Sequence, residues 1–323
     1  MQAWVEELLA DAGLGASVSV LELGGGTFNT VLRVSTRDGD VIVKVARDFT
    51  LMSYEHGIMA TEALYYRLAA EHGVTSVPQA LHYGQCDGRD ALVLSVCPGR
   101  PWPELADKLD RGMRAALRAE VGRELAALHR ITGPGYGYPA RPLSPTWRLA
   151  FLGMIGAVLD DARRFNTPLP GGTDRVAALV DRASPVLDEV TAPALVHFDL
   201  WDGNILVDRV DDGSLPRLGG LIDAERAFWG DPIAEVASLR LFGDIEPDAA
   251  LLEGYRGAGG RLVLDESVRL RLLLYRLYLY LIMWVETVPR RSDASRIAWL
   301  RTAVLAPLAT MLDTLERRNP ATR

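Results

Sequence analysis

Lysine is scarce in this sequence. Only Lys44 and Lys108 occur among the 35 Lys and Arg residues of the 323-residue chain. A P-loop needs the pattern G-x-x-x-x-G-K-[ST], because its lysine reaches the nucleotide phosphates and its hydroxyl binds magnesium. Val45 follows the first lysine and Leu109 follows the second. The sequence therefore excludes the P-loop class of nucleotide-binding proteins.

Cysteine, long apolar runs and a basic excess are lacking as well. Cys86 and Cys97 form no CxxC pair, so neither a disulfide framework nor a zinc cluster is indicated. The most apolar stretch, Leu272–Val285, contains Arg276 and is shorter than the roughly 20 residues that span a bilayer, which predicts a buried helix. The formal charge of −7 argues against a nucleic-acid-binding face, and residues 1–12 are typical of a short amphipathic helix rather than a signal peptide. We expect a cytoplasmic protein with neither a nucleic-acid nor a membrane partner.

The first 96 residues predict a β-rich unit with one helix. Turn signals such as Arg37–Gly39 separate short runs of β-branched and apolar residues. The expected elements are strands at Val18–Leu23, Thr30–Thr36, Asp40–Ala46, Ala80–Tyr83 and Ala91–Val96, with a helix at Met52–His72. A segment with prolines and a glycine follows, and it predicts a hinge at about residues 95–100.

Residues 97–323 are expected to be mostly helical. Helices are expected at Glu104–Arg130, Pro145–Phe165, Thr173–Val190, Pro232–Phe242, Asp248–Tyr255, Asp265–Glu286 and Asp293–Arg317. Three short strands interrupt them, at Ala194–Val196, Ile205–Val207 and Leu218–Ile222. Polar residues therefore gather between short apolar strands at the centre of a helical region.

A glycine-rich motif lies between the first two expected strands. It reads Gly24-x-Gly26-x-x-Asn29. Glycine lets the backbone approach phosphate oxygens closely and present N–H donors to them. Taken alone, such a motif is more often a simple turn, so it needs support from elsewhere in the chain.

Lys44 ends an apolar strand, where a buried ammonium is costly unless a carboxylate pairs with it. The helix that follows offers Glu62 as the first choice of partner and Glu55 as the second. A solvent-exposed lysine on an edge strand is the alternative interpretation. In a chain that otherwise uses arginine, we favour a phosphate-binding role, because a compact ammonium acts on phosphate as a point charge.

Two acidic motifs supply the expected chemistry. His197, Asp199 and Asn204 follow the spacing H-x-D-x-x-x-x-N, and Asp223 comes directly after an apolar strand. A kinase catalytic loop uses the same spacing, with the aspartate orienting the acceptor hydroxyl and the asparagine on magnesium. A second carboxylate would complete a magnesium site made of oxygen ligands.

These motifs resemble those of the aminoglycoside phosphotransferase family, and the resemblance covers nearly the whole chain. The loop from His197 to Asn204 is similar to the family's H-G-D-x-x-x-x-N, and Ile222-Asp223 is similar to its I-D magnesium strand. Gly230-Asp231-Pro232 matches the G-D-P that follows in the family. Neither D-F-G nor A-P-E stands after the metal strand, which disfavours a protein kinase with an activation loop.

The resemblance implies an α+β, two-lobed protein-kinase-like fold. The N-terminal lobe, residues 1–96, would hold an antiparallel five-stranded sheet with one helix and would bind the nucleotide. The larger, mainly helical C-terminal lobe, residues 97–323, would carry the catalytic loop and the acceptor site. The residues implied at ATP are Gly24, Gly26, Asn29, Lys44, Glu62, Ser95 and Cys97, the last two through backbone near the adenine.

The same resemblance assigns the chemistry. Asp199 would be the catalytic base, and Asn204 and Asp223 would bind Mg²⁺. His197 would support the loop by hydrogen bonding. We expect Phe198 and Trp201, which replace residues usual in the family, to shape the acceptor side.

Acceptor residues are expected in the helical lobe. The candidates are Trp201, Asp202, Glu225, Trp284 and Glu286. An aromatic ring with several carboxylates would suit a cationic, hydroxylated ligand such as an amino sugar. For Trp284 and Glu286 we favour the alternative of a core residue and a solvated charge at a helix end.

We therefore expect an ATP- and Mg²⁺-dependent O-phosphotransferase acting on a small hydroxylated molecule, first of all an aminoglycoside-like antibiotic. A metabolite kinase acting on a sugar, amino sugar, amino alcohol or nucleoside is the alternative, and a non-catalytic nucleotide-binding module is a weaker one. The sequence does not distinguish ATP from GTP as donor. No feature points to an obligatory protein partner.

Overall fold

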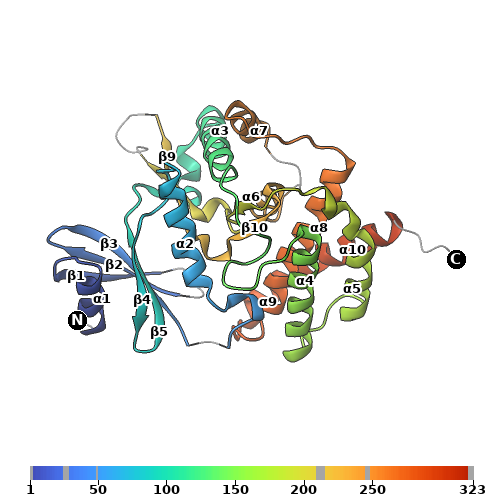
Figure 1. Ribbon diagram of the computed structural model, residues 1–323, viewed down its shortest axis with the longest axis horizontal. Coiled ribbons are helices and arrows are strands. Elements are labelled where there is room, and N and C mark those ends of the chain that lie inside the picture. Colours follow the sequence, from blue (N-terminus) through green and yellow to red (C-terminus); the bar gives the residue numbers. More distant parts are fainter. Residues whose placement is uncertain (1–2, 25–28, 49, 209–214, 244–247, 319–323) are drawn as a thin grey trace.

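The computed structural model describes residues 3–24, 29–48, 50–208, 215–243 and 248–318. It has two lobes: a small lobe built on a β-sheet and a larger helical lobe (Figure 1). The fold class predicted from the sequence, with its five-stranded antiparallel sheet and helical C-terminal region, is confirmed. The exact boundary between residues 96 and 97 stays a prediction.

The small lobe contains one antiparallel sheet with the strand order β1-β2-β3-β5-β4. Its strands are β1 (Ser17–Leu23), β2 (Asn29–Thr36), β3 (Gly39–Ala46), β4 (Ala80–Cys86) and β5 (Arg89–Ser95). Each lies within a few residues of the expected position. The tight turns at residues 37–38 and 87–88 account for the β2–β3 and β4–β5 hairpins.

The two faces of this sheet have different roles, because successive side chains of a strand point to opposite faces. Val41, Val43 and Val45 of β3 pack with α1 (Ala3–Asp11) in a small hydrophobic core. Lys44 lies between two of these valines in the sequence and so points to the opposite face. This alternation places its ammonium on the side of the sheet that carries α2 (Ile58–Glu71).

Helix α2 begins later than expected. The helix predicted at Met52–His72 is divided into a 3₁₀ turn, Ser53–Glu55, and α2 itself. Gly57 separates them with φ = +76°, a left-handed conformation that is readily available only to glycine. A Cβ atom at this position would also lie 2.6 Å from the Cβ of Ala140, so glycine is required twice over.

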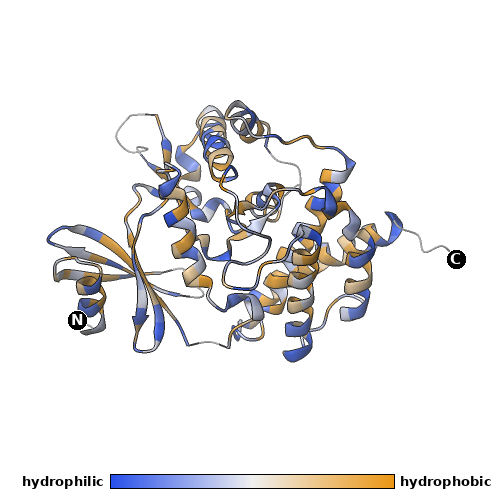
Figure 2. Cartoon of the chain, in the orientation of Figure 1, coloured by the Kyte–Doolittle hydropathy of each residue, from blue (hydrophilic) through white to orange (hydrophobic). Residues whose placement is uncertain are grey.

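The larger lobe is built from helices packed around one extensive core. These are α3 (Arg111–Leu128), α4 (Trp147–Arg164), α5 (Gly172–Ala183), α6 (Glu235–Leu239), α7 (Ala249–Gly257), α8 (Glu266–Val285), α9 (Ala294–Leu300) and α10 (Ala306–Arg318). Hydrophobic residues concentrate where these helices meet (Figure 2). The single helix expected at Glu104–Arg130 is wrong in its first part, because a 3₁₀ turn ends at Lys108 and Asp110 then caps α3.

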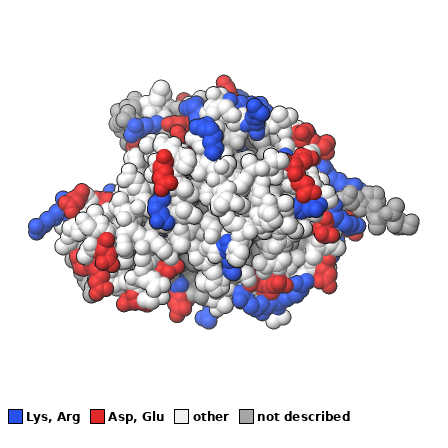
Figure 3. Space-filling model, in the orientation of Figure 1, with Lys and Arg blue, Asp and Glu red and all other residues white. Residues whose placement is uncertain are grey.

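Helix α8 corresponds to the most apolar stretch of the sequence, and it is a buried element of the core, as expected. In the described part of the chain, no helix combines the length and the apolar character needed to cross a membrane. Acidic and basic side chains are interspersed on the face shown in Figure 3.

Short strands at the centre of the larger lobe form the framework of the expected site. The hairpin of β8 (Ile205–Asp208) and β9 (Arg217–Leu221) joins β6 (Arg100–Pro101) in one small sheet, and β7 (Ala194–Val196) pairs with β10 (Phe228–Gly230) in another. The sequence did not indicate β6 or β10, which are two and three residues long.

Glycines bring the hinge close to the β8–β9 hairpin. A Cβ atom at Gly219 would lie 2.1 Å from the carbonyl oxygen of Pro98, and one at Gly220 would lie 2.7 Å from the Cβ of Cys97. Gly99, with φ = +96°, meets the carbonyl oxygen of Val207 in the same way. The hinge thus lies directly on the hairpin whose ends carry Asn204 and Asp223.

Candidate active site

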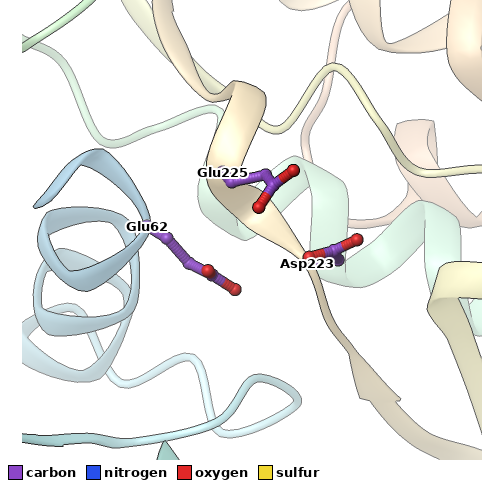
Figure 4. A group of neighbouring side chains, drawn as sticks. All are labelled: Glu62, Asp223 and Glu225. Carbon is purple, nitrogen blue, oxygen red and sulfur yellow. The ribbon is translucent and has the colours of Figure 1, made fainter. Parts of the chain in front are cut away.

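The centre of the site is a buried charge cluster around Lys44. Its Nζ atom lies 2.7 Å from Glu62 Oε2, 2.6 Å from Asp223 Oδ1 and 3.8 Å from Glu225 Oε2. Glu62 projects from α2 toward the turn that carries the other two carboxylates (Figure 4). The preferred partner of Lys44 is therefore in contact with it, whereas Glu55, the second choice, pairs with Arg290 instead.

The three carboxylates offer ligand atoms within 4.8 Å of one another, as in a site for a cation. The ammonium of Lys44 already lies among them. Burial by itself would lower the pKa of Lys44, but the Asp223 and Glu62 carboxylates outweigh it and hold that pKa above its ordinary value. Burial raises the pKa of Glu225 well above its ordinary value, and the charge of Asp223 adds to this shift. We therefore regard Glu62, Glu225 and the Oδ1 atom of Asp223 as the binding site of the lysine side chain.

Tyr66 connects α2 to the end of β9. Its hydroxyl donates to Glu62 Oε1 at 3.0 Å and accepts the backbone N–H of Asp223 at 2.8 Å. Asp223 has φ = +68°, a left-handed conformation that aspartate adopts more readily than most residues. The hydrogen bond from its N–H fixes this conformation and directs the carboxylate to Lys44.

Side chains from α6 hold the backbone of the catalytic loop. The carboxylate of Glu235 accepts the N–H of His197 at 2.8 Å and that of Phe198 at 3.0 Å, and Ser238 Oγ accepts the N–H of Leu200 at 3.0 Å. Burial would raise the pKa of Glu235, but the imidazole of His129, with Nε2 3.6 Å from Glu235 Oε2, and the backbone hydrogen bond from His197 keep it below its ordinary value. A charged acceptor is therefore maintained beneath the loop.

The imidazole of His197 is fully buried and acts as a bridge. Its Nε2 atom lies 3.0 Å from the carbonyl oxygen of Ile222, and its Nδ1 atom lies 3.3 Å from the backbone N–H of Asp199. One neutral tautomer, with the proton on Nε2, satisfies both contacts. His197 thus joins the catalytic loop to the end of β9, in agreement with the supporting role predicted for it.

Phe198 does not shape the acceptor side. It has φ = +61°, which explains the glycine usual at this position in the family, and its side chain is fully buried. The ring contacts Phe228 and Tyr278, with centroid distances of 4.9 and 5.7 Å. Burial of this aromatic ring offsets the strain of the backbone.

Asn204 precedes β8 and Asp223 follows β9, so both residues lie at the open end of the β8–β9 hairpin. The N–H of Ile222 donates to the carbonyl oxygen of Asn204 at 3.0 Å, so the two residues flank a paired segment. The Nδ2 atom of Asn204 donates to the carbonyl oxygen of Asp199 at 2.8 Å, which leaves its Oδ1 oxygen for another partner. An amide oxygen beside a carboxylate fits the ligand preference of Mg²⁺.

Asp199 is close to an arginine that sequence reasoning missed. Arg226 Nε lies 3.7 Å from Asp199 Oδ2, and Arg226 Nη2 lies 3.3 Å from Glu286 Oε2. Burial raises the pKa of Asp199, while the guanidinium opposes this shift. Its place only three residues after Asp223 in the sequence could have indicated that Arg226 lies near the site.

The acceptor candidates do not form one wall. Trp201 is 43% exposed, and its role at the acceptor stays a prediction. Trp284 is a core residue that donates from Nε1 to the carbonyl oxygen of Pro168, which agrees with the favoured alternative. Asp202 forms an ion pair with Arg118 at 2.5 Å.

The last two candidates are also engaged. Glu225 contacts Lys44 and Asn29, and its placement at the acceptor stays a prediction. Glu286 is paired with Arg226 rather than solvated at a helix end.

Of the remaining nucleotide-side candidates, Gly26 lies outside the described residues. Gly24 directly follows β1. Asn29 is the first residue of β2 and is buried. Ser95 is the last residue of β5, and its N–H donates to the carbonyl oxygen of Gln79. Burial raises the pKa of the Cys97 thiol to about 11, so this cysteine stays protonated at the hinge.

A family model described as "Phosphotransferase enzyme family" matches residues 19–273. The chain belongs to this family. The match confirms the resemblance to aminoglycoside phosphotransferases and the enzyme class predicted from it, a phosphotransferase with an alcohol group as acceptor.

Two curated relatives are named as kinases. A probable ketoamine kinase of Thermus thermophilus is 31% identical over 245 residues, which cover 73% of this chain and 78% of that protein. The chloroplastic protein-ribulosamine 3-kinase of Arabidopsis thaliana is 23% identical over 224 residues, or 64% of this chain. The chain spans 62% of the length of the plant protein.

Solved structures share the fold. A candidate fructosamine-3-kinase from Haemophilus somnus 129PT has a TM-score of 0.68 and 19% identity, with 96% of each chain covered. The streptomycin–ATP ternary complex of APH(2")-IIa has a TM-score of 0.62 and 18% identity, covering 97% of this chain and 98% of that one.

Proposed function

We propose that this phosphotransferase uses ATP and Mg²⁺ to phosphorylate a hydroxyl of a sugar-derived metabolite of the ketoamine type. The observation that carries the kinase activity is the cluster of Lys44, Glu62 and Asp223 beside a catalytic loop with Asp199 and Asn204. The names of the relatives favour the metabolite alternative over the antibiotic acceptor first expected from the sequence.

The residues of the acceptor side support this choice. An aminoglycoside carries several ammonium groups, and such groups bind best to carboxylates without a cationic partner. Asp202 and Glu286 are instead paired with Arg118 and Arg226, and Glu225 contacts Lys44. A surface in which arginine offsets the carboxylates suits an acceptor of low net charge.

In the proposed reaction, the chain mainly positions the reactants and stabilises charge, because phosphoryl transfer through a loose transition state needs little covalent assistance. Lys44 would bind the phosphates, held in place by Glu62. Asp199 would accept a hydrogen bond from the acceptor hydroxyl and orient it in line with the γ-phosphate. Asn204 and Asp223 would hold Mg²⁺, which neutralises charge that develops on the phosphate oxygens.

A nucleotide-consumption assay over several acceptor classes tests the proposal. We expect ADP release with ribulosamine- or fructosamine-type ketoamines and little release with aminoglycosides or nucleosides. Turnover with aminoglycosides but not with ketoamines would refute the proposed acceptor class.

The catalytic assignment has its own test. Asp199→Ala should abolish turnover while the variant still binds ATP, because Asp199 acts on the acceptor rather than on the nucleotide. Undiminished turnover would show that another group orients the hydroxyl.

A further inference from the structure

Asn29 and Glu225 meet between the two lobes. Asn29 begins β2, and Glu225 lies in the 3₁₀ turn after Asp223, 196 positions later in the chain. The Nδ2 atom of Asn29 donates to Glu225 Oε2 at 2.8 Å. The two residues are only 3% and 8% exposed, so water competes little for this hydrogen bond.

The amide of Asn29 is oriented with its Nδ2 atom toward the carboxyl group of Glu225. With Nδ2 toward Glu225, the Oδ1 atom of Asn29 is buried and has no hydrogen-bond partner in the described part of the chain.

The same carboxylate oxygen is linked to the lysine cluster. Glu225 Oε2 lies 3.8 Å from Lys44 Nζ. Asn29 on β2 pairs with Ala46 on β3, two residues after Lys44. Glu225 therefore contacts two adjacent strands of the sheet at the point where both reach the Asp223 turn.

On the basis of the proposed function, we propose that Asn29 and Glu225 are positioning residues whose hydrogen bond holds the start of β2 against the Asp223 turn and so assembles the ATP site before the nucleotide binds. In the motif Gly24-x-Gly26-x-x-Asn29, Asn29 occupies the place of the third glycine of the kinase pattern G-x-G-x-x-G, and the contact with Glu225 gives its side chain a role. Apparent affinity falls with the fraction of molecules in the binding-competent arrangement, so loss of the hydrogen bond weakens ATP binding.

Three single variants separate the hydrogen bond from the charge. Asn29→Ala removes the donor, Glu225→Ala removes the acceptor together with its charge, and Glu225→Gln removes the charge but keeps an acceptor oxygen. Binding of a non-hydrolysable ATP analogue with Mg²⁺ is measured by calorimetry in the absence of any acceptor. We expect Kd to rise about tenfold for both alanine variants, equivalent to about 1.4 kcal/mol, and less than about threefold for the glutamine variant.

Two further readouts distinguish positioning from general destabilisation. The double variant Asn29→Ala/Glu225→Ala should bind no more weakly than either single variant, because both remove the same interaction. In turnover assays, KM for ATP should rise more than kcat falls. The control variant is Glu316→Ala. It removes an exposed ion-pair partner of Arg175, and both residues are distant in sequence from Asn29 and Glu225, so Kd should stay unchanged.

An unchanged Kd in Asn29→Ala, or a Glu225→Gln variant as weak as Glu225→Ala, would overturn the inference. The second result would assign the effect to charge instead of the hydrogen bond. A wild-type protein that binds no nucleotide would refute the proposed function and this inference with it. A wild type that binds the analogue but phosphorylates no ketoamine would refute only the proposed acceptor, since the binding data stand alone.

Discussion

Replacing Lys44 by methionine should destabilise the folded protein as well as weaken ATP binding. The lysine side chain is 7% exposed, and that of Glu62 is fully buried. Methionine keeps much of the apolar stem but leaves the carboxylates of Glu62, Asp223 and Glu225 without their cation. Removing one partner of a buried ion pair costs about 3–5 kcal/mol, and we expect a loss of this size at neutral pH.

The pH dependence of this loss provides the sharper test. Without the ammonium, burial and mutual repulsion hold the carboxylate pKa values in the folded state above their values of about 4 in the unfolded chain. A raised carboxyl pKa destabilises the fold once the pH exceeds the unfolded value, and protonation at lower pH relieves it. The difference in unfolding free energy between wild type and Lys44→Met should therefore shrink as the pH falls from 8 to 5.

Lys108→Met is the matched control, because Lys108 is exposed and ends a 3₁₀ turn remote in sequence from the cluster. Urea denaturation at several pH values and titration with ATP and Mg²⁺ would be measured for both variants. We expect Lys108→Met to match the wild type in both. Equal behaviour of the two variants, or a deficit of Lys44→Met that is independent of pH, would refute the reasoning.

Two more outcomes follow from the site. Arg226→Met removes the cation that lowers the pKa of Asp199, so the acid limb of the pH–kcat profile should move to higher pH; a shift to lower pH would contradict the assignment. Glu235→Gln can accept only one of the N–H groups of His197 and Phe198 and should lose about 1.5–3 kcal/mol of stability at pH 7, measured by urea denaturation. Because the pKa of Glu235 is lowered in the folded protein, its stabilisation is present above the unfolded pKa and is lost in acid, so this deficit should also shrink there.

The regular elements could be predicted because their signals are local. The apolar run around Val43 identified β3, and the hairpin turns delimited the neighbouring strands. The division of the expected helix at Gly57, in contrast, was not predicted: Gly57 has φ = +76° and lies where a Cβ atom would meet Ala140, a tertiary constraint that no local pattern reports. The strands β6 and β10 are too short to carry a periodic signal.

Motif spacing also determined much of the candidate site. The pairing of Lys44 with Glu62 and the placement of Asn204 beside the end of β9 followed from motif order and from the family resemblance. The spacing of residues in the motifs did not reveal which charged side chains form ion pairs with one another. Arg226 belongs to no recognised motif in the sequence, yet it lies between Asp199 and Glu286.

By itself, the sequence determined the kind of chemistry, since a lone lysine on an apolar strand and a spaced set of Asp and Asn residues define a phosphotransferase site. Only the tertiary structure decided which carboxylates are neutralised. It turned Glu225 toward Asn29 and Lys44, and it paired Asp202 with Arg118. The physical reason is that a charge pair depends on distances of a few ångströms between segments far apart in the chain, and hydrophobic patterning sets those distances only through the packing of the whole fold.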